Sequence, residues 1–244
     1  MKKLKNKKAI VVIAFGGSVL APKDLDIALL AKLRSLLLAS IKSQKSKFVI
    51  VVGGGNPARK YQAIAKKLNP TAMQADLDRI GIASTKLNAE LIRVIFGKNS
   101  HSKIIDSESL VKNTKSPLTV ISGWNPGYST DAVAVRTAKK LKIGAVIIAG
   151  KPAYVYNKDF TKFNNAKPFA YISWANYIKL IPKQWSPGLK TPVDPIAAKE
   201  ARLHNIDAIV ISGKDMKNIA SLLRGRAFRG TLISNRPRQG IAQK

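Results

Sequence analysis

The residues that most clearly suggest ligand binding or catalysis lie in the stretch FVIVVGGGNPAR, where a predicted strand ends in glycines. Residues 48–52 are continuously apolar and mostly β-branched, which is typical of a strand buried on both faces of a parallel sheet. The glycines at 53–55 leave bare backbone that can turn sharply and approach a ligand. Asn56 and Pro57 are predicted to cap and begin a helix whose free N–H groups favour anions. Arg59, in the first turn, could fork onto a phosphate, although a tight turn beside a solvated arginine explains the same residues.

Two further predicted strands end in glycine-bearing corners. Residues 9–15 run into Gly-Gly-Ser at 16–18, which lacks the G-x-x-x-x-G-K-[ST] pattern of a P-loop. Residues 118–121 run into the loop SGWNPGYSTD at 122–131. Because the carboxyl ends of parallel strands meet at one edge of a sheet, three such corners predict a shared crevice for a phosphate-bearing ligand.

For one carboxylate and two histidines, a functional role has to be weighed against a purely structural one. Asp78 is predicted in the first turn of a helix, where it either complements the helix dipole or accepts hydrogen bonds from ribose hydroxyls. His101 and His204 stand in no recognisable catalytic or ligand spacing, so we expect both to be surface or packing residues. No metal-ligating residue is predicted.

The elements between these corners follow from apolar periodicity and capping residues. Thr130 or Asp131 is predicted to cap the helix that ends near 141, and Ser173 a short helix to about 180. Asp194 and Pro195 are predicted as the cap and first residue of a helix to about 204. Further helices are predicted over 24–42, 56–68, 76–96 and 217–224, and further strands over 145–149, 208–212 and 231–233. This alternation predicts an α/β fold, a three-layer αβα sandwich around a mainly parallel sheet.

Composition bounds the class of protein. The 244 residues are 45% hydrophobic, enough for a large globular core, and contain no cysteine, which excludes disulfides and thiolate metal sites. The formal net charge of +30 would suit a polyanion, but the lysines are scattered along the chain, so we expect no nucleic-acid partner. The basic leader before residue 9 precedes an apolar run too short for a membrane span. We therefore expect a soluble, cytoplasmic protein without a membrane partner.

The order of the motifs resembles that of the archaeal uridylate kinases of the amino-acid kinase superfamily, from about residue 9 to residue 233. Each motif is short, and the resemblance rests on five of them in the right order. They are GGSVL at 16–20, VGGG at 52–55 with ARKY at 58–61, Asp78 followed by GI at 81–82 and LNA at 87–89, NPG at 125–127 with STDA at 129–132, and DPIAAK at 194–199.

The resemblance implies a UMP kinase that uses ATP and Mg²⁺ to make UDP in pyrimidine biosynthesis. It implies one domain over residues 1–244, with an acceptor lobe at about 9–145, an ATP lobe at about 146–233 and a tail at 234–244. It also implies a homohexamer. The residues it implies for UMP are Gly54, Asp78, Trp124, Asn125, Pro126, Gly127, Tyr128, Ser129 and Thr130. For the ATP side and the path of the phosphoryl group they are Gly17, Ser18, Gly55, Arg59, Ala149, Gly150, Tyr156 and Asp159. The resemblance assigns catalysis to Arg59 and to Asp194, which would orient groups at the reaction centre.

The chain departs from the family pattern in two places. Many relatives have a lysine two residues before the first glycine pair, where this chain has Ala14, although archaeal members vary there. After the strand ending near residue 148 the family has TNVDGVY, whereas this chain has AGKPAYVY at 149–156, with one extra residue. Lys151 could restore positive charge in this stretch, or the ATP pocket could be altered.

Two alternatives stay open from the sequence. The same fold could phosphorylate another acceptor, such as isopentenyl phosphate, carbamate or an amino acid. The kinases of isopentenyl phosphate carry a histidine near the second glycine corner, which this chain lacks. Alternatively, the altered stretch at 149–156 and the charge of +30 would fit a nucleotide-binding regulator or a basic nucleic-acid-binding protein without catalysis.

Overall fold

The centre of the fold is a sheet of seven strands in the order β3-β2-β1-β4-β8-β9-β7. This computed structural model describes residues 9–44, 46–184, 189 and 191–236. Five neighbouring strands are parallel, and they are the buried apolar runs that the sequence predicts as strands. They are β1 (Ile10–Phe15), β2 (Lys47–Val52), β3 (Leu118–Ile121), β4 (Ala145–Gly150) and β8 (Asp207–Ser212).

The far edge of the sheet differs from its centre. Strand β9 (Thr231–Ser234) is antiparallel to β8 and parallel to β7 (Tyr171–Ser173). A separate antiparallel ribbon is formed by β5 (Val155–Tyr156) and β6 (Pro168–Phe169). Strand β9 is predicted from the sequence, whereas β5, β6 and β7 are not, because two or three residues are too few to show an alternating pattern.

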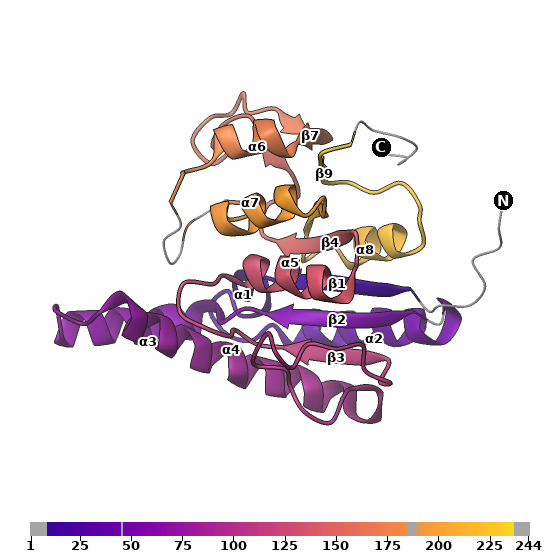
Figure 1. Ribbon diagram of the computed structural model, residues 1–244, viewed down its shortest axis with the longest axis horizontal. Helices are drawn as coiled ribbons and strands as arrows, with labels where there is room; N and C mark the ends of the chain where they lie inside the picture. Colours follow the sequence, from indigo (N-terminus) through magenta and orange to yellow (C-terminus); the bar gives the residue numbers. More distant parts are fainter. Residues whose placement is uncertain (1–8, 45, 185–188, 190, 237–244) are drawn as a thin grey trace.

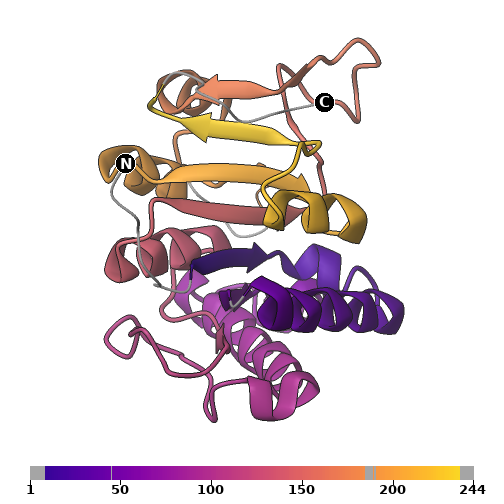
Figure 2. The same ribbon diagram turned by 90° about the vertical axis from the view of Figure 1, so that its right-hand side faces the viewer.

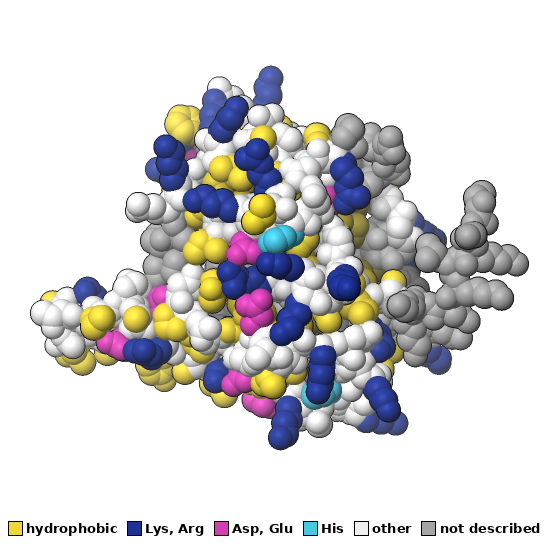
Figure 3. All heavy atoms as spheres, in the orientation of Figure 1, with side chains coloured by type: hydrophobic (Ala, Val, Ile, Leu, Met, Phe, Trp, Pro, Cys, Tyr) yellow, Lys and Arg dark blue, Asp and Glu magenta, His cyan; other side chains and the backbone are white. Residues whose placement is uncertain are grey.

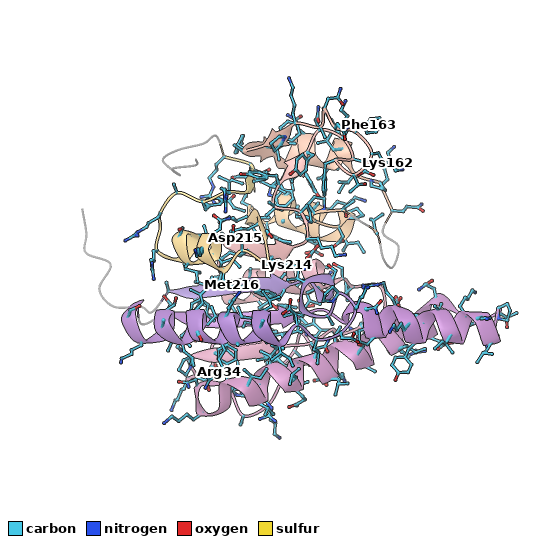
Figure 4. All side chains as sticks on the ribbon, turned by 180° about the vertical axis from the view of Figure 1, so that it is seen from behind. Arg34, Lys162, Phe163, Lys214, Asp215 and Met216 are labelled. Atoms are coloured by element: carbon cyan, nitrogen blue, oxygen red, sulfur yellow. The ribbon has the colours of Figure 1, made fainter. Side chains whose placement is uncertain are left out.

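Helices cover both faces of the sheet, which confirms the predicted three-layer αβα sandwich (Figures 1 and 2). On one face lie α5 (Thr130–Leu141), α6 (Trp174–Leu180) and α7 (Pro195–Leu203) (Figure 1); on the other lie α2 (Ile27–Gln44), α4 (Gln74–Phe96) and α8 (Met216–Leu223) (Figure 4). The side chains of β1 point alternately to the two faces of the sheet. Val12 and Ala14 belong to the core beneath α5 and α7, and Ile13 and Phe15 belong to the core beneath α2 and α8. The turn Gly97–Asn99 follows α4.

A long helical arm extends beyond the carboxyl edge of the strands. It consists of α3 (Gly55–Leu68) and the first turns of α4, which pack against each other (Figure 1). On α3 the apolar residues Tyr61, Ile64 and Leu68 are 65%, 55% and 79% exposed, and Met73 before α4 is 68% exposed. Figure 3 shows hydrophobic side chains exposed along the arm. None of the described helices is long and apolar enough to cross a bilayer.

Three predicted helix starts need correction. Helix α3 begins at Gly55 with Gly54 as its N-cap, so Asn56 is not the cap; its side chain donates instead to the carbonyl of Lys23. Arg59 is then the fifth residue of its helix, not part of the first turn. Helix α4 begins at Gln74, which moves Asp78 to the fifth position and leaves Asp76 in the first turn.

The third correction concerns α5, whose N-cap is Ser129 and not Thr130 or Asp131. The Ser129 hydroxyl accepts from the N–H of Ala132 at 3.0 Å. A hydroxyl that accepts this bond satisfies one of the free N–H groups of the first turn. Two other predicted caps are confirmed: Ser173 caps α6, and Asp194 caps α7 with Pro195 at the first position.

Candidate active site

The candidate site lies where the strand order reverses. The chain runs from β1 outward to β2 and β3, and then returns to place β4 on the other side of β1. In open α/β sheets, such a point leaves a crevice at the carboxyl edge, and ligands bind there. The first corner crosses this point, because the N–H of Gly16 donates to the carbonyl of Ala149 at 3.2 Å.

The first and second glycine corners touch through their backbones. A Cβ on Gly17 would lie 2.0 Å from the nitrogen of Gly55, and one on Gly53 would lie 2.3 Å from the nitrogen of Gly17. Gly55 also has a φ of +74°, which side chains rarely adopt. Only glycine allows this approach, which brings the N-terminus of the short helix α1 (Gly17–Leu20) against that of α3.

The third corner meets the second through Thr130 and through helix α4. A Cβ on Gly53 would lie 3.1 Å from the hydroxyl oxygen of Thr130. From α4, Asn88 donates to the carbonyl of Gly53 at 2.8 Å, and the hydroxyl of Ser84 donates to that of Gly54 at 2.9 Å. Helix α4 therefore supports the second corner with polar side chains one turn apart.

Helix α4 also holds the third corner. The hydroxyl oxygen of Thr85 accepts from the N–H of Gly123 at 2.8 Å. Asp78 Oδ2 accepts from the N–H of Gly127 at 2.8 Å, and its Oδ1 accepts from Gln74 at 2.9 Å. Gly127 has a φ of +87°, so the turn requires glycine at this position. Ser84 and Thr85 are not among the site residues predicted from the sequence, although their helical spacing from Asp78 and Asn88 places them on the same side of α4.

The remaining residues of the third corner differ in their exposure and in their contacts. Asn125 and Pro126 are exposed at the tip of the loop. The ring of Tyr128 stacks under the guanidinium of Arg136, 4.5 Å from its centroid. Trp124 is 6% exposed, and its indole N–H is buried without a hydrogen-bond partner among the described residues. Buried donors are normally satisfied, so this N–H is a candidate for contact with a ligand.

Asp194 is buried, and its two oxygens are occupied. Its Oδ1 accepts from the N–H groups of Ile196 and Ala197 at 2.8 and 3.1 Å, and its Oδ2 accepts from the hydroxyl of Ser129. This carboxylate therefore ties the third corner to the start of α7. Two bonds from Tyr177 support it: the phenol donates to the carbonyl of Val193 at 2.6 Å and accepts from its N–H at 2.7 Å.

A second carboxylate, Asp131, lies beside Asp194. Burial raises the pKa of Asp131 well above its ordinary value, and the charge of Asp194 raises it further. Burial also raises the pKa of Asp194, although the hydroxyl of Ser129 and the N–H groups of α7 partly offset this by stabilising its charge. Two carboxylates with raised pKa values at a sheet's carboxyl edge are typical of functional sites. From the sequence Asp131 is predicted only as a possible helix cap, and the structure instead places it inside α5, whose cap is Ser129.

Two predicted site residues have no side-chain partner among the described residues: Ser18 is half-buried and Arg59 is exposed. Ser18 is the second residue of α1, and Arg59 is the fifth residue of α3, just past its first turn; the glycine contact brings the starts of these two helices together. Arg59 is exposed, and neither side chain makes a hydrogen bond or ion pair within the described ranges. Both are therefore free to bind a ligand at the crevice.

On the other side of the switch point, the strands β4 and β8 end together. The carbonyl of Gly150 accepts from the N–H of Gly213 at 2.8 Å, and a Cβ on Gly213 would lie 2.9 Å from the carbonyl oxygen of Ala149. Ala149 and Gly150 thus border the first corner; that they contact ATP stays a prediction. Gly213 is a further corner that the sequence analysis did not identify.

Tyr156 and Asp159 lie on the β5–β6 ribbon. The Tyr156 ring stacks on Phe160 with centroids 4.7 Å apart, and Asp159 accepts from the N–H and hydroxyl of Thr161 at 2.9 and 2.6 Å. The ribbon is fixed to the sheet because the N–H of Val155 donates to the hydroxyl of Thr231 at 2.8 Å. These two predicted ATP residues therefore lie toward the far half of the sheet, where the ribbon is attached to β9.

Three comparisons identify similar proteins. A model described as the amino acid kinase family matches residues 9–212. The chain is 32% identical over 227 residues to a uridylate kinase of Methanococcoides burtonii, covering 90% of this chain and 93% of that protein. It is 31% identical over 228 residues to a uridylate kinase of Pyrococcus abyssi, covering 91% and 98%.

Solved structures agree with this likeness. The crystal structure of uridylate kinase from Archaeoglobus fulgidus superposes with a TM-score of 0.78 at 26% identity, covering 92% of this chain and 99% of that one. The UMP kinase of Ureaplasma parvum superposes with a TM-score of 0.75 at 21% identity, covering 94% and 100%. At that identity the second match supports the fold alone.

Proposed function

Because the chain belongs to the amino acid kinase family, we propose that it is a UMP kinase, which transfers the γ-phosphoryl group of ATP to UMP to give UDP and ADP. The observation that carries the proposal is the contact of Gly17 with Gly53 and Gly55, extended by Asp78 to Gly127. These contacts unite the three glycine corners at one edge of the sheet. The names of the similar uridylate kinases indicate the acceptor.

On the acceptor side, Gly54, Asp78 and the loop from Trp124 to Thr130 would hold UMP. Asp78 is fixed by Gly127 and Gln74, and a carboxylate has further lone pairs that can accept ribose hydroxyls. An oxygen of the acceptor would also satisfy the indole N–H of Trp124. This arrangement favours a ligand rich in both hydroxyl groups and oxygen acceptors.

On the transfer path, Gly17, Ser18, Gly55 and Arg59 would surround the moving phosphoryl group. Phosphoryl transfer requires in-line positioning and neutralisation of charge, with little covalent participation of the protein. The N-termini of α1 and α3 supply N–H groups and Ser18 a hydroxyl. Arg59 supplies a cation that has no ion-pair partner among the described residues. Asp194, whose oxygens are occupied, would act as a positioning residue that holds Ser129 and the acceptor loop.

On the donor side, Ala149, Gly150, Tyr156 and Asp159 would contact ATP. The described residues contain no group of three or more His, Asp or Glu that could cage a metal ion. This fits Mg²⁺ bound to nucleotide phosphates, because such ions keep several waters and need at most one or two protein carboxylates. When bound, Mg²⁺ would neutralise part of the phosphate charge.

We further propose that the protein is a homo-oligomer built through the α3–α4 arm. Tyr61, Ile64 and Leu68 recur at i, i+3 and i+7 and form one exposed apolar stripe, with Met73 at its end. A contiguous apolar stripe of this kind typically marks an interface, and a second copy of the arm would cover it. The double variant Ile64→Glu, Leu68→Glu should lower the mass measured by light scattering, whereas Leu203→Glu, at the exposed last residue of α7, should not. An unchanged mass in the double variant would exclude this interface.

A coupled assay of the purified protein tests the activity. ADP formation from ATP and Mg²⁺ is measured with UMP, CMP, AMP and GMP as acceptors, and with isopentenyl phosphate, carbamate and amino acids. We expect the highest kcat/KM for UMP. Turnover of another acceptor without turnover of UMP would overturn the proposal, and binding of UMP and ATP without turnover would favour a regulator.

A further inference from the structure

Three consecutive residues of the third corner are held by three different helices. The N–H of Gly127 donates to Asp78 of α4 at 2.8 Å, and the hydroxyl of Ser129 donates to the carboxylate that caps α7. Between these two residues, the ring of Tyr128 lies against the guanidinium of Arg136 of α5, 4.5 Å from the ring centroid. Helices α5 and α7 lie on the same face of the sheet (Figure 1). Arg136 is the one residue of these contacts that the proposed function leaves without a role.

Two carboxylates from separate segments fix Arg136. Its Nη1 donates to Glu108 Oε2 at 3.1 Å, and its Nη2 donates to Glu200 Oε1 at 2.7 Å. Glu108 lies in the segment that precedes β3, whereas Glu200 lies on α7, which packs against α5. The planar guanidinium presents its N–H groups in a rigid fork, so it can hold both carboxylates and still offer a face to an aromatic ring. Its charge is already compensated, which distinguishes Arg136 from Arg59, a residue with no ion pair in the described part of the chain.

The segment that carries Glu108 is itself attached to two helices. From α5, Lys140 Nζ donates to the carbonyl of Glu108 at 2.5 Å and to that of Ser109 at 3.3 Å. From α4, Lys86 forms an ion pair of 2.9 Å with Asp106. The position of the guanidinium is therefore determined by parts of the chain that lie outside the third corner. A side chain of the corner that stacks on this guanidinium is held at the same fixed position.

We propose that Arg136 is a positioning residue, which orders the third corner for the acceptor nucleotide by holding the ring of Tyr128. The corner needs such support, because Asn125 and Pro126 are exposed and Gly127 has the backbone freedom of a glycine. A loop that is already ordered loses less conformational entropy when its ligand binds, so it binds more tightly. The ordering of the corner is a property of the free protein, whereas the identity of the ligand that benefits from it rests on the proposed function.

Amide hydrogen exchange of the ligand-free protein tests the ordering of the corner. Mass spectrometry follows the peptides that cover residues 123–129 in Arg136→Met, which removes the guanidinium, and in Tyr128→Leu, which removes the ring and keeps both ion pairs. We expect exchange there to become about tenfold faster in each variant, which corresponds to the loss of a partly buried cation–π contact. Arg93→Met is the matched control, because Arg93 is similarly half-buried and forms an ion pair with Glu90 on α4. Wild-type exchange rates in both Arg136→Met and Tyr128→Leu would overturn the proposal.

Calorimetric titration with UMP and with ATP tests the consequence for binding. Arg136→Met should raise the Kd for UMP about tenfold and leave the Kd for ATP unchanged. The double variant with Tyr128→Leu should lose little more than either single variant, because both substitutions remove the same contact. Equal losses for UMP and ATP, or additive losses in the double variant, would indicate a general packing defect and overturn the proposal.

Two further outcomes are separable. If Arg136→Met does not fold, Arg136→Lys provides the same comparison, since it keeps the charge and lacks the planar fork. If the wild-type protein does not bind UMP, the proposed function fails, whereas faster exchange at the corner in the variants still supports the positioning role of Arg136.

Discussion

A Cβ atom on Gly17 would lie 2.0 Å from the amide nitrogen of Gly55, so the first and second glycine corners are in backbone contact. Neither backbone segment can move away without shifting a helix, because Gly17 is the first residue of α1 and Gly55 is the first residue of α3. The same substitution would also approach the carbonyl carbon of Gly53 at 2.8 Å. This contact is what sets the width of the crevice between the two helix starts.

We predict that Gly17→Ala destabilises the fold and reduces activity together. Overpacking of this kind costs about 1–3 kcal/mol or more, because backbone atoms have to move. Gly144→Ala is the control, since a Cβ there meets nothing within 4 Å. Urea denaturation should give a lower free energy of unfolding for Gly17→Ala alone. Equal stabilities of the two variants would contradict the contact.

Asp78→Asn should weaken UMP binding with little effect on ATP. An amide keeps one acceptor oxygen but loses the charge and the second acceptor that hold Gly127 and Gln74. The loss of one charged hydrogen bond corresponds to roughly a tenfold rise in the KM for UMP. Asp76→Asn, which breaks an exposed ion pair with Arg79 on the same helix, is the matched control. A KM for UMP that rises equally in both variants would remove Asp78 from the site.

Arg59→Ala should reduce kcat/KM strongly without lowering stability. The side chain is exposed and has no described partner, so its removal leaves no unsatisfied group in the fold. The loss of a group that stabilises transition-state charge costs about 3–4 kcal/mol of activation free energy. Lys60→Ala removes an exposed cation from the next position and should change kcat/KM by less than about threefold, since surface charges act weakly. Arg59→Ala with wild-type kcat/KM would contradict the assigned role.

Much of this site follows from local sequence, and the rest depends on contacts across the chain. Glycines after buried strands predict the corners at 16–18, 53–55 and 122–131, and parallel strands predict that they share an edge. The bond from Asp78 to Gly127 joins residues 49 positions apart, and the sequence holds no local sign of it. The start of α3 was misplaced because Asn-Pro is a good cap and first residue, whereas the backbone contact of Gly55 with Gly17 decides the actual start. The pairing of Asp131 with Asp194 likewise arises only when α5 packs against α7.

The carboxylate pair predicts how stability depends on pH. The pKa values of Asp131 and Asp194 are raised in the folded state, mainly by burial, so folding retains protons that the unfolded chain has lost. Stability contributed by this pair is therefore present below the unfolded pKa and is lost as pH rises through the raised values. Asp131→Asn removes one buried charge and its repulsion with Asp194. Its free energy of unfolding relative to wild type should increase from pH 4 to pH 8, whereas Asp106→Asn, at an exposed ion pair with Lys86, should give no such rise. A pH-independent difference for Asp131→Asn would contradict the coupling.

Tyr177→Phe should destabilise the segment that presents Asp194. The phenol is fully buried, donates to the carbonyl of Val193 and accepts from its N–H, so phenylalanine would leave two buried backbone groups unsatisfied. Such losses cost about 1–3 kcal/mol. Tyr171→Phe is the matched control, because its hydroxyl donates to the carbonyl of Arg236 at an exposed position. Since Val193 directly precedes Asp194, the variant should also lower kcat for UMP phosphorylation while leaving the KM for ATP near the wild-type value. If both phenylalanine variants unfold at the same urea concentration as wild type, the two bonds to Val193 do not hold the start of α7 in place.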